Sequence, residues 1–277
     1  MKKTTYILLG MVMSGFILIA VMAGLAYLFS QPAASRRWAL DKQQTTVALP
    51  AACRVFILQP INRPGDDLLR DGHGRSRIYL ERSDLTIMPV DTDTGSLTFP
   101  LELKPYLSVV TQGDSCMVCL DLSDEVYRKF RLEQEGTLLA EFGHMELKLP
   151  AGVDQMELNW ENLNTQLHSW QCDSLSLSSL SSVEIRGSHF AQLCLHQGRF
   201  TMKEVKVDHL RVDLDKVYDW QVQAESCEIG VEHLWGSGQH NCLIQRGECE
   251  EMHWNPTAEG ASLTLSLQQA AEVRLQE

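Results

Sequence analysis

The chain has 277 residues, of which 44% are hydrophobic and 22% charged, a composition typical of a folded protein rather than a disordered or collagen-like one. Its formal net charge is −12, and because residues 1–42 carry +4, residues 43–277 carry −16. Nucleic-acid binding needs a surface rich in Lys and Arg that neutralises phosphates. The acidic charge therefore argues against a nucleic-acid partner.

Residues 6–29 form a stretch of 24 positions without a charge, a proline or a side-chain amide. As a helix, this stretch would be about 36 Å long, enough to cross a hydrocarbon core of about 30 Å. A cleavable signal peptide is the alternative, but its apolar core is usually only about 7 to 15 residues long. The sequence therefore predicts an uncleaved transmembrane anchor over 6–29, in contact with the membrane.

Basic residues flank both ends of this stretch, so the positive-inside rule alone does not fix its orientation. A short N-terminal tail with an early pair of lysines is typical of a signal anchor. We therefore predict a cytoplasmic tail over 1–5, a juxtamembrane linker over 30–50, and a single-pass location at the cell (inner) membrane with the C-terminal domain periplasmic or extracellular. The reverse orientation, a scaffold facing the cytoplasm, is the alternative.

The eight cysteines all follow the apolar stretch, and an even number in an exported domain suggests disulfide bonds. Several of them, however, alternate with apolar residues as buried strand residues do, which favours mostly reduced thiols in the core. Cys116 and Cys119 form a CxxC motif, but the residues around them are typical of a strand, where positions three apart point to opposite faces. A metal or redox role for this pair is therefore not expected.

Residues 51–150 show a period-two alternation of apolar and polar residues, which predicts a strand-rich N-terminal part of the domain. The segment 125–143 interrupts it and fits either a short helix or a loop. In residues 151–277 short alternating stretches recur every eight to eleven residues, so that pairs of them recur near twenty. Asn-Gly and Asp-Gly hairpin signals are missing between them, which favours stacked parallel strands. The prediction is a mainly β protein whose domain is a parallel β-helix, or β-solenoid.

The segment from Asp173 to Ser188, followed by Leu193-Cys194-Leu195 and by Leu210 to Leu214, resembles the GIN domain, the head domain of autotransporter adhesin-like proteins of the bacterial envelope. The resemblance implies a right-handed parallel β-helix over roughly residues 77–275. It implies no defined activity, so no site residue is carried over from the family.

Histidines and acidic residues are the first candidates for chemistry. Several histidines fall on successive alternating stretches, so stacking would bring some of them together, and imidazole and thiolate suit zinc. Without a known register, surface histidines are the better interpretation, and no metal, cofactor or catalytic residue is predicted. Asp213 and Asp215 alternate with apolar residues and fit a solvated strand face better than an acid–base pair. The histidines are His189, His196, His209, His233, His240 and His253.

Tryptophans are the candidates for contact with a glycan or a partner protein. Exposed on one face of the domain, their rings would stack on sugars, whereas the alternative interpretation places them in the core. The chosen contact residues are Trp220, Trp235 and Trp254. The resulting hypothesis is an envelope protein that presents a β-solenoid for structural or protein or glycan interaction, without catalysis. The alternative is a carbohydrate-active enzyme that uses acidic residues on the solenoid face.

Overall fold

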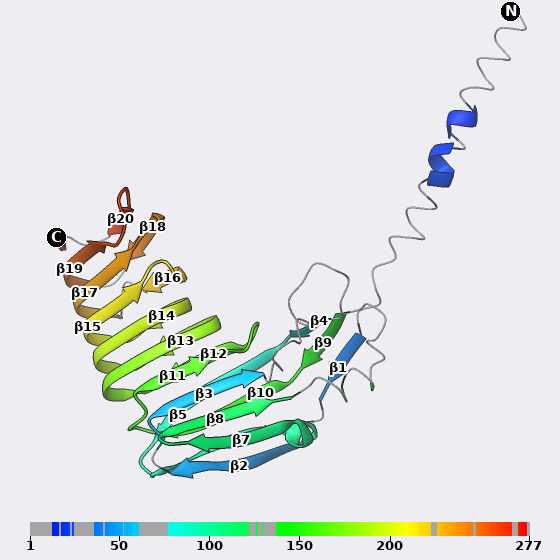
Figure 1. The fold of residues 1–277 in the computed structure, drawn as a ribbon, viewed down its shortest axis with the longest axis horizontal. Coiled ribbons are helices and arrows are strands. Elements are labelled where there is room, and N and C mark those ends of the chain that lie inside the picture. Colours follow the sequence, from blue (N-terminus) through cyan, green and yellow to red (C-terminus); the bar gives the residue numbers. More distant parts are fainter. Residues whose placement is uncertain are drawn as a thin grey trace, which may run out of the picture.

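The computed structural model describes residues 13–16, 18–22, 24, 36–40, 42–51, 53–60, 77–121, 126, 129, 137–222, 226–245, 248–267 and 271–275. Most of these residues lie in β-strands, which form one sheet of three strands and one of eighteen. Figure 1 shows the later strands stacked in chain order, from β11 (Gln155–Leu158) to β20 (Ser262–Leu267).

The expected transmembrane helix over 6–29 is not found. Within that stretch the structure describes residues 13–16, 18–22 and 24 as helical, and no described helix is long and apolar enough to cross a bilayer, which needs about 20 residues. The predictions of a membrane anchor and of a single-pass location at the inner membrane are therefore wrong on this finding. The rest of 6–29 and the expected tail over 1–5 lie outside the described residues.

The three-stranded sheet comprises β1 (Arg36–Ala39), β4 (Arg77–Leu80) and β9 (Thr137–Glu141). The middle strand is β9, and it is parallel to both neighbours. Trp38 of β1 packs edge-on against Tyr106 and Phe142, with ring centroids 6.0 Å apart in each case. Residues 36–39 and 44–50, which lie within the linker expected over 30–50, thus form strands, and the first of these strands is fixed by a buried aromatic side chain.

The N-terminal part of the large sheet is of mixed direction. Strand β6 is antiparallel to β2 and to β10, and β7 is antiparallel to β8, whereas β5–β10 and β3–β8 are parallel pairs. A 3-10 helix, η2 (Leu101–Tyr106), connects β6 to β7. The strands are β2 (Gln44–Ala51), β3 (Val55–Pro60), β5 (Ser83–Val90), β6 (Thr94–Pro100), β7 (Leu107–Gln112), β8 (Ser115–Leu120) and β10 (Gly143–Pro150).

From β11 onward the strand pairs among the described residues are all parallel. Strands β11 and β12 both pair with the long β13, and β13 pairs with β14, which in turn pairs with β15 and β16. Two ladders follow, β15–β17–β19–β21 and β16–β18–β20. The strands are β12 (Asn164–His168), β13 (Gln171–Arg186), β14 (His189–Lys203), β15 (Lys206–Asp213), β16 (Val217–Val222), β17 (Glu228–Gly236), β18 (Gln239–Gln245), β19 (Glu248–Pro256) and β21 (Glu272–Leu275).

The predicted fold class, a parallel β-helix, is therefore wrong: the domain is built on a large mixed sheet. A period of two in the sequence shows which side chains point inward, but this period is the same in parallel and antiparallel strands. It therefore does not show the direction in which neighbouring strands run. Parallel pairing was correctly expected after residue 150. The hairpin β7–β8 was missed, although its two-residue turn, Gly113-Asp114 with φ of 63° at the glycine, has a typical hairpin sequence.

One row of inward side chains crosses nine strands and forms the centre of the core, and we call it the inward column. Its members are register partners on successive strands, so each apolar side chain packs between two others. Full burial of each such side chain contributes about 1.5–3 kcal/mol. The column runs through Cys116, Phe56, Met156, Leu177, Leu195, Val212, Leu234, Trp254 and Leu275, and all but Leu275 are buried.

Candidate functional site

A local irregularity in β13 borders an open concave surface of the chain. Between Ser178 and Ser182 the register of β13 shifts, so that three residues of β13 face the single Gly198 of β14. Gly198 has a φ of 130°, and a Cβ atom there would lie 2.7 Å from the carbonyl oxygen of Ser179. Only glycine fits this close approach, so the β-bulge depends on the residue at this position.

Hydrogen bonding and burial hold the bulge in shape. The side chain of Ser179 is buried, and its Oγ accepts a hydrogen bond from the backbone N–H of Ser181 at 3.1 Å. Leu180, the next residue, is displaced outward and is exposed. The bulge thus turns a polar side chain inward and an apolar one outward.

The connection from β11 to β12 forms the opposite wall. Trp160 and Leu163 of this connection are buried, while Asn162 adopts a left-handed φ of 60°, a conformation that Asn tolerates better than most residues. The side chains of Glu161 and Asn162 are therefore exposed. Asn164, at the start of β12, donates a hydrogen bond from Nδ2 to Oδ1 of Asp84 at 3.2 Å, which orients its amide.

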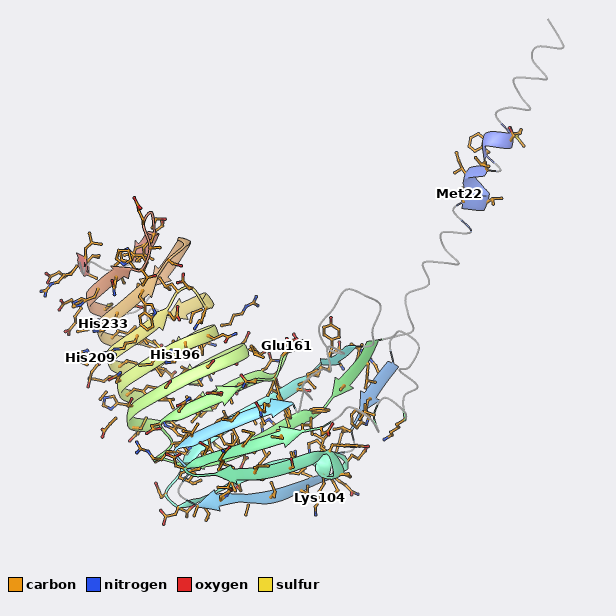
Figure 2. All side chains as sticks on the ribbon, in the orientation of Figure 1. Met22, Lys104, Glu161, His196, His209 and His233 are labelled. Atoms are coloured by element: carbon orange, nitrogen blue, oxygen red, sulfur yellow. The ribbon has the colours of Figure 1, made fainter. Side chains whose placement is uncertain are left out.

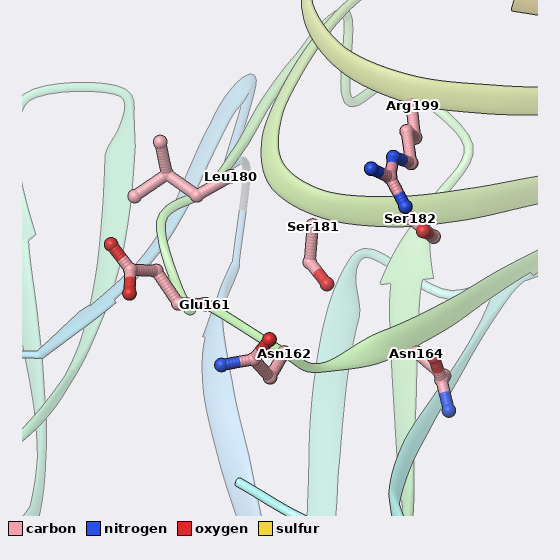
Figure 3. Close-up of a pocket in the computed structure, with 7 residues that line it drawn as sticks. All are labelled: Glu161, Asn162, Asn164, Leu180, Ser181, Ser182 and Arg199. Atoms are coloured by element: carbon pink, nitrogen blue, oxygen red, sulfur yellow. The ribbon is translucent and has the colours of Figure 1, made fainter. Parts of the chain in front are cut away.

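Between the two walls lies an open pocket of about 400 Å³, within the usual range of small-molecule sites. Figure 3 shows the guanidinium group of Arg199 reaching toward Ser181 and Ser182, with Glu161 on the side of Leu180. The lining residues are Glu161, Asn162, Asn164, Leu180, Ser181, Ser182 and Arg199. They come from the connection between β11 and β12, from the start of β12, from the bulge in β13 and from β14.

The chemistry of the pocket is that of hydrogen bonding to a polar ligand. Hydroxyl and amide groups both donate and accept, and a guanidinium offers up to five N–H donors. Glu161 is the one carboxylate among the described lining residues. The groups that line the pocket can hydrogen-bond a polyhydroxylated ligand.

The predicted tryptophan contacts have different surroundings. Trp254 is only 6% exposed and belongs to the inward column, where its ring offers little face to a ligand. Trp235 is half-buried on the outer face of β17, beside Asp213 and Asn255 in register. The side chain of Trp220 lies outside the described residues. Neither Trp235 nor Trp254 is among the described residues that line the pocket.

Three of the predicted histidines do come together, on the outer face of neighbouring parallel strands. The rings of His209 and His233 are stacked with centroids 6.0 Å apart, and those of His233 and His253 are 4.8 Å apart. Figure 2 shows His209 and His233 close together, with His196 on the neighbouring strand β14. We call His209, His233 and His253 the histidine row; the side chain of His240 lies outside the described residues.

Charged side chains surround the histidine row. In register, Arg211 precedes His233, and Arg274 follows His253. Burial, together with the neighbouring His253, Arg211 and His209, lowers the pKa of His233. His253 donates a hydrogen bond to Glu251 at 2.6 Å, which lowers the pKa of that carboxyl.

Among the described residues no group of three or more His, Cys, Asp or Glu side chains is arranged to hold a metal ion. Asp213 and Asp215 have structural contacts instead. Asp213 is buried, not solvated as expected, and its carboxylate accepts the N–H of Asp215. The Asp215 carboxylate accepts the N–H of Ser237 on the next turn at 2.8 Å.

The pocket residues were not predicted from the sequence, although a signal for them existed. The run from Ser174 to Ser182 begins with an alternation of Ser and Leu that is typical of a strand with small outward residues. Strict alternation, however, places Ser179 and Ser181 at inward positions and Leu180 at an outward one. Polar residues at inward positions beside an apolar outward one indicate a local departure from the regular strand.

Comparison with known proteins gives distant structural likenesses. No family model matches the chain, and no curated protein does. Among solved structures, a candidate adhesin from Bacteroides fragilis has a TM-score of 0.48 at 8% identity, over 86% of this chain and 100% of that one. A candidate lipid-binding protein from Parabacteroides distasonis has a TM-score of 0.37 at 10% identity, over 87% and 100%. A candidate adhesin from Parabacteroides merdae has a TM-score of 0.35 at 9% identity, over 87% and 98%. None of them is named as a GIN domain, so that resemblance stays a prediction.

Proposed function

We propose that this chain is a non-catalytic binding protein that takes one or two sugar units of a glycan into the pocket beside the β13 bulge. The observation that carries the proposal is the lining of this pocket by hydroxyl, amide and guanidinium groups, held by a backbone irregularity that requires Gly198. Sugar hydroxyls need donors and acceptors in about equal measure, and these side chains supply both. Leu180 adds an apolar contact for the C–H face of a sugar ring.

The pocket is also suited to this role because its frame is rigid and its lining is accessible. The backbone of the bulge is fixed by the Ser179–Ser181 hydrogen bond, and one wall is anchored by the buried side chains of Trp160 and Leu163. Binding groups carried on a pre-formed frame lose little conformational entropy on association. A single sugar unit in an open pocket is expected to bind weakly, with Kd on the order of 1 mM.

The test is saturation-transfer NMR and calorimetry with a panel of neutral, N-acetylated and acidic mono- and disaccharides. Arg199→Ala should weaken binding about tenfold, since a lost charge-assisted hydrogen bond is worth about 1.5–3 kcal/mol. Arg186→Ala is the matched control, because Arg186 is an exposed arginine on β13 outside the pocket and pairs with Glu184 at 2.9 Å. The bound oligosaccharide should be recovered uncleaved. The proposal is refuted if no sugar of the panel binds. It is also refuted if the variants Arg199→Ala and Ser181→Tyr, both at lining residues, bind sugar as tightly as the unmodified chain does.

A further inference from the structure

A line of cationic and protonatable side chains crosses four neighbouring parallel strands on their outer face. Arg211 on β15 is opposite His233 on β17, which is opposite His253 on β19, and Arg274 on β21 is the next register partner. Neighbouring strands of a sheet are about 4.8 Å apart, so these side chains start at regular steps across the strands. His209 lies beside the line, with its ring stacked on that of His233 at 6.0 Å. The face therefore offers N–H donors at a regular spacing.

An irregularity in β15 places His209 on this face. Asp208 and His209 are both exposed, whereas Val207 and Leu210 on either side are buried, so the alternation is interrupted between them. On the adjacent strand, a Cβ atom at Gly230 would lie 2.7 Å from the carbonyl oxygen of Asp208, so this close approach of two backbones requires glycine. The position of the His209 ring thus depends on the backbone of two strands as well as on stacking.

Arg211 has different surroundings from other arginines of the parallel strands. Arg186 pairs with Glu184 at 2.9 Å, and Arg274 pairs with Glu251 at 2.8 Å. Arg211 is exposed, and within the described part of the chain it has neither an ion pair nor a side-chain hydrogen bond. Its charge instead disfavours protonation of the neighbouring His233. An anion placed beside Arg211 would supply the missing partner.

The carboxylates on this face lie near the far end of the line and are already paired. Glu251 accepts a hydrogen bond from His253 at 2.6 Å and pairs with Arg274, and Glu272 also pairs with Arg274, at 3.0 Å. On the other side of Arg211, its register partner is Cys194 of β14, a thiol. The charged and titratable groups that face His233 are Arg211, His209, His253 and Glu251, followed along the line by Arg274, Glu272 and Cys194.

We propose that Arg211 and the histidine row form a second binding site, which takes the acid groups of a linear acidic glycan and binds it more tightly when the histidines are protonated. Carboxylate and sulfate groups accept hydrogen bonds from guanidinium and imidazolium N–H groups, and such charge-assisted bonds are about twice as strong as neutral ones. These residues are not among those that line the pocket, so the site is distinct from the one proposed above.

A single glycan chain fits this face better than an anionic membrane surface does. Residues 43–277 carry a net charge of −16, which disfavours contact with an extended anionic surface. Binding to anionic lipids typically uses clusters of about four to eight Lys and Arg residues, whereas the line holds only Arg211 and Arg274. A linear acidic glycan carries its acid groups at regular intervals and can lie across the strands.

Binding of the anion is linked to protonation of the histidines. A bound acid group offsets the repulsion of His233 by Arg211 and so favours the charged imidazolium. Reciprocally, protonation increases the affinity for the anion, by up to about tenfold per pH unit when one proton is taken up. Carboxylic acids have pKa values of about 4, so the ligand keeps its charge while the histidines titrate.

The experiment is calorimetry of the full chain with a uronic-acid tetrasaccharide at pH 7.5 and 5.5, at constant ionic strength. A neutral tetrasaccharide of the same linkage is the ligand control, and two buffers of different ionisation enthalpy report the protons taken up. We expect Kd for the acidic ligand to fall about tenfold or more at the lower pH, with net proton uptake.

Substitutions separate this site from the rest of the surface. Arg211→Gln should weaken binding about tenfold at pH 5.5, and His233→Gln should reduce the pH dependence. Arg186→Gln and His168→Gln are the matched controls, because Arg186 pairs with Glu184 and His168 is hydrogen-bonded to Gln166, both outside the histidine row. They should leave affinity and pH dependence unchanged.

The variant Arg199→Ala, in the pocket, should also leave this binding unchanged, so failure of one site is distinguishable from failure of the other. The proposal is overturned if the unmodified chain binds the acidic tetrasaccharide equally at both pH values, binds the neutral one as tightly, or binds neither. It is also overturned if Arg211→Gln binds as the unmodified chain does. Binding to vesicles of anionic phospholipid in place of the tetrasaccharide would assign the face to a lipid headgroup and reject the glycan.

Discussion

Substitution of Leu177 by Asp tests the division of the parallel strands into inward and outward positions. Leu177 is 1% exposed, and it lies in the inward column between Met156 and Leu195 as register partners. Neither neighbour can donate a hydrogen bond through its side chain, and the thioether sulfur of Met156 is only a weak acceptor. An aspartate at this position would therefore replace apolar contacts by a polar group without a partner.

The expected magnitude follows from two contributions. Truncation of a buried Leu to Ala costs about 2–5 kcal/mol through lost burial and the cavity that remains. An unpaired buried carboxyl adds about 1–3 kcal/mol by comparison with other buried polar groups. Leu177→Asp should thus destabilise the chain by about 3–8 kcal/mol, a large part of the roughly 5–15 kcal/mol that stabilises a typical domain.

The assay is urea unfolding followed by the fluorescence of the buried tryptophans, with Ser176→Asp as the matched control. Ser176 is the preceding residue on β13 and faces outward, so its substitution should change the free energy of unfolding by no more than about 0.5 kcal/mol. With a urea dependence of about 2–3 kcal/mol per molar, the midpoint for Leu177→Asp should fall by roughly 2 M. Equal midpoints for the two variants would show that the inward assignment on β13 is incorrect.

Two further substitutions test the bulge and the histidine row. Gly198→Ala should destabilise by about 1–3 kcal/mol, because its Cβ would meet the Ser179 carbonyl, whereas Gly152→Ala, with nothing within 4 Å, should have little effect on thermal unfolding. The pKa of His233 in the folded state lies below its value of about 6.5 in the unfolded state. The unfolded state therefore binds a proton more readily, so the stability that is present above about pH 6.5 is lost as the pH falls from about 6.5 through the folded-state pKa. Unfolding measured between pH 7.5 and 5.5 should show less acid destabilisation for His233→Gln than for the unmodified chain, and identical pH profiles would contradict the argument.

Alternation in the sequence was a good guide to burial and a poor guide to strand direction. Leu175, Leu177, Leu193 and Leu195 were expected to point inward, and all four are buried. Local patterning determines this because successive side chains on a strand point to opposite faces. Strand direction and pairing, by contrast, depend on contacts between distant segments, such as the antiparallel pairing of β6 with β2 and β10.

The histidine row was predictable only in part. The alternation placed His209, His233 and His253 on successive strands, but whether their side chains meet depends on the register between the strands, which spacing alone does not give. The pairing of Phe56 on β3 with Cys116 on β8 had no sequence signal, since the two strands pair only after about sixty intervening residues have folded.

The location of the pocket follows from the geometry of parallel ladders. A regular ladder repeats the same Cβ spacing on every strand and therefore presents a nearly flat face, so a concave site needs an added residue or a changed turn. In this chain, the residues that shape the backbone of the site are different from the residues that line the pocket. Gly198 and Ser179 shape the backbone and are buried or sterically constrained, whereas Arg199 and Asn162 are exposed. Substitution of the lining should change ligand affinity with little effect on stability, so the specificity of the site can vary while the fold that carries it remains the same.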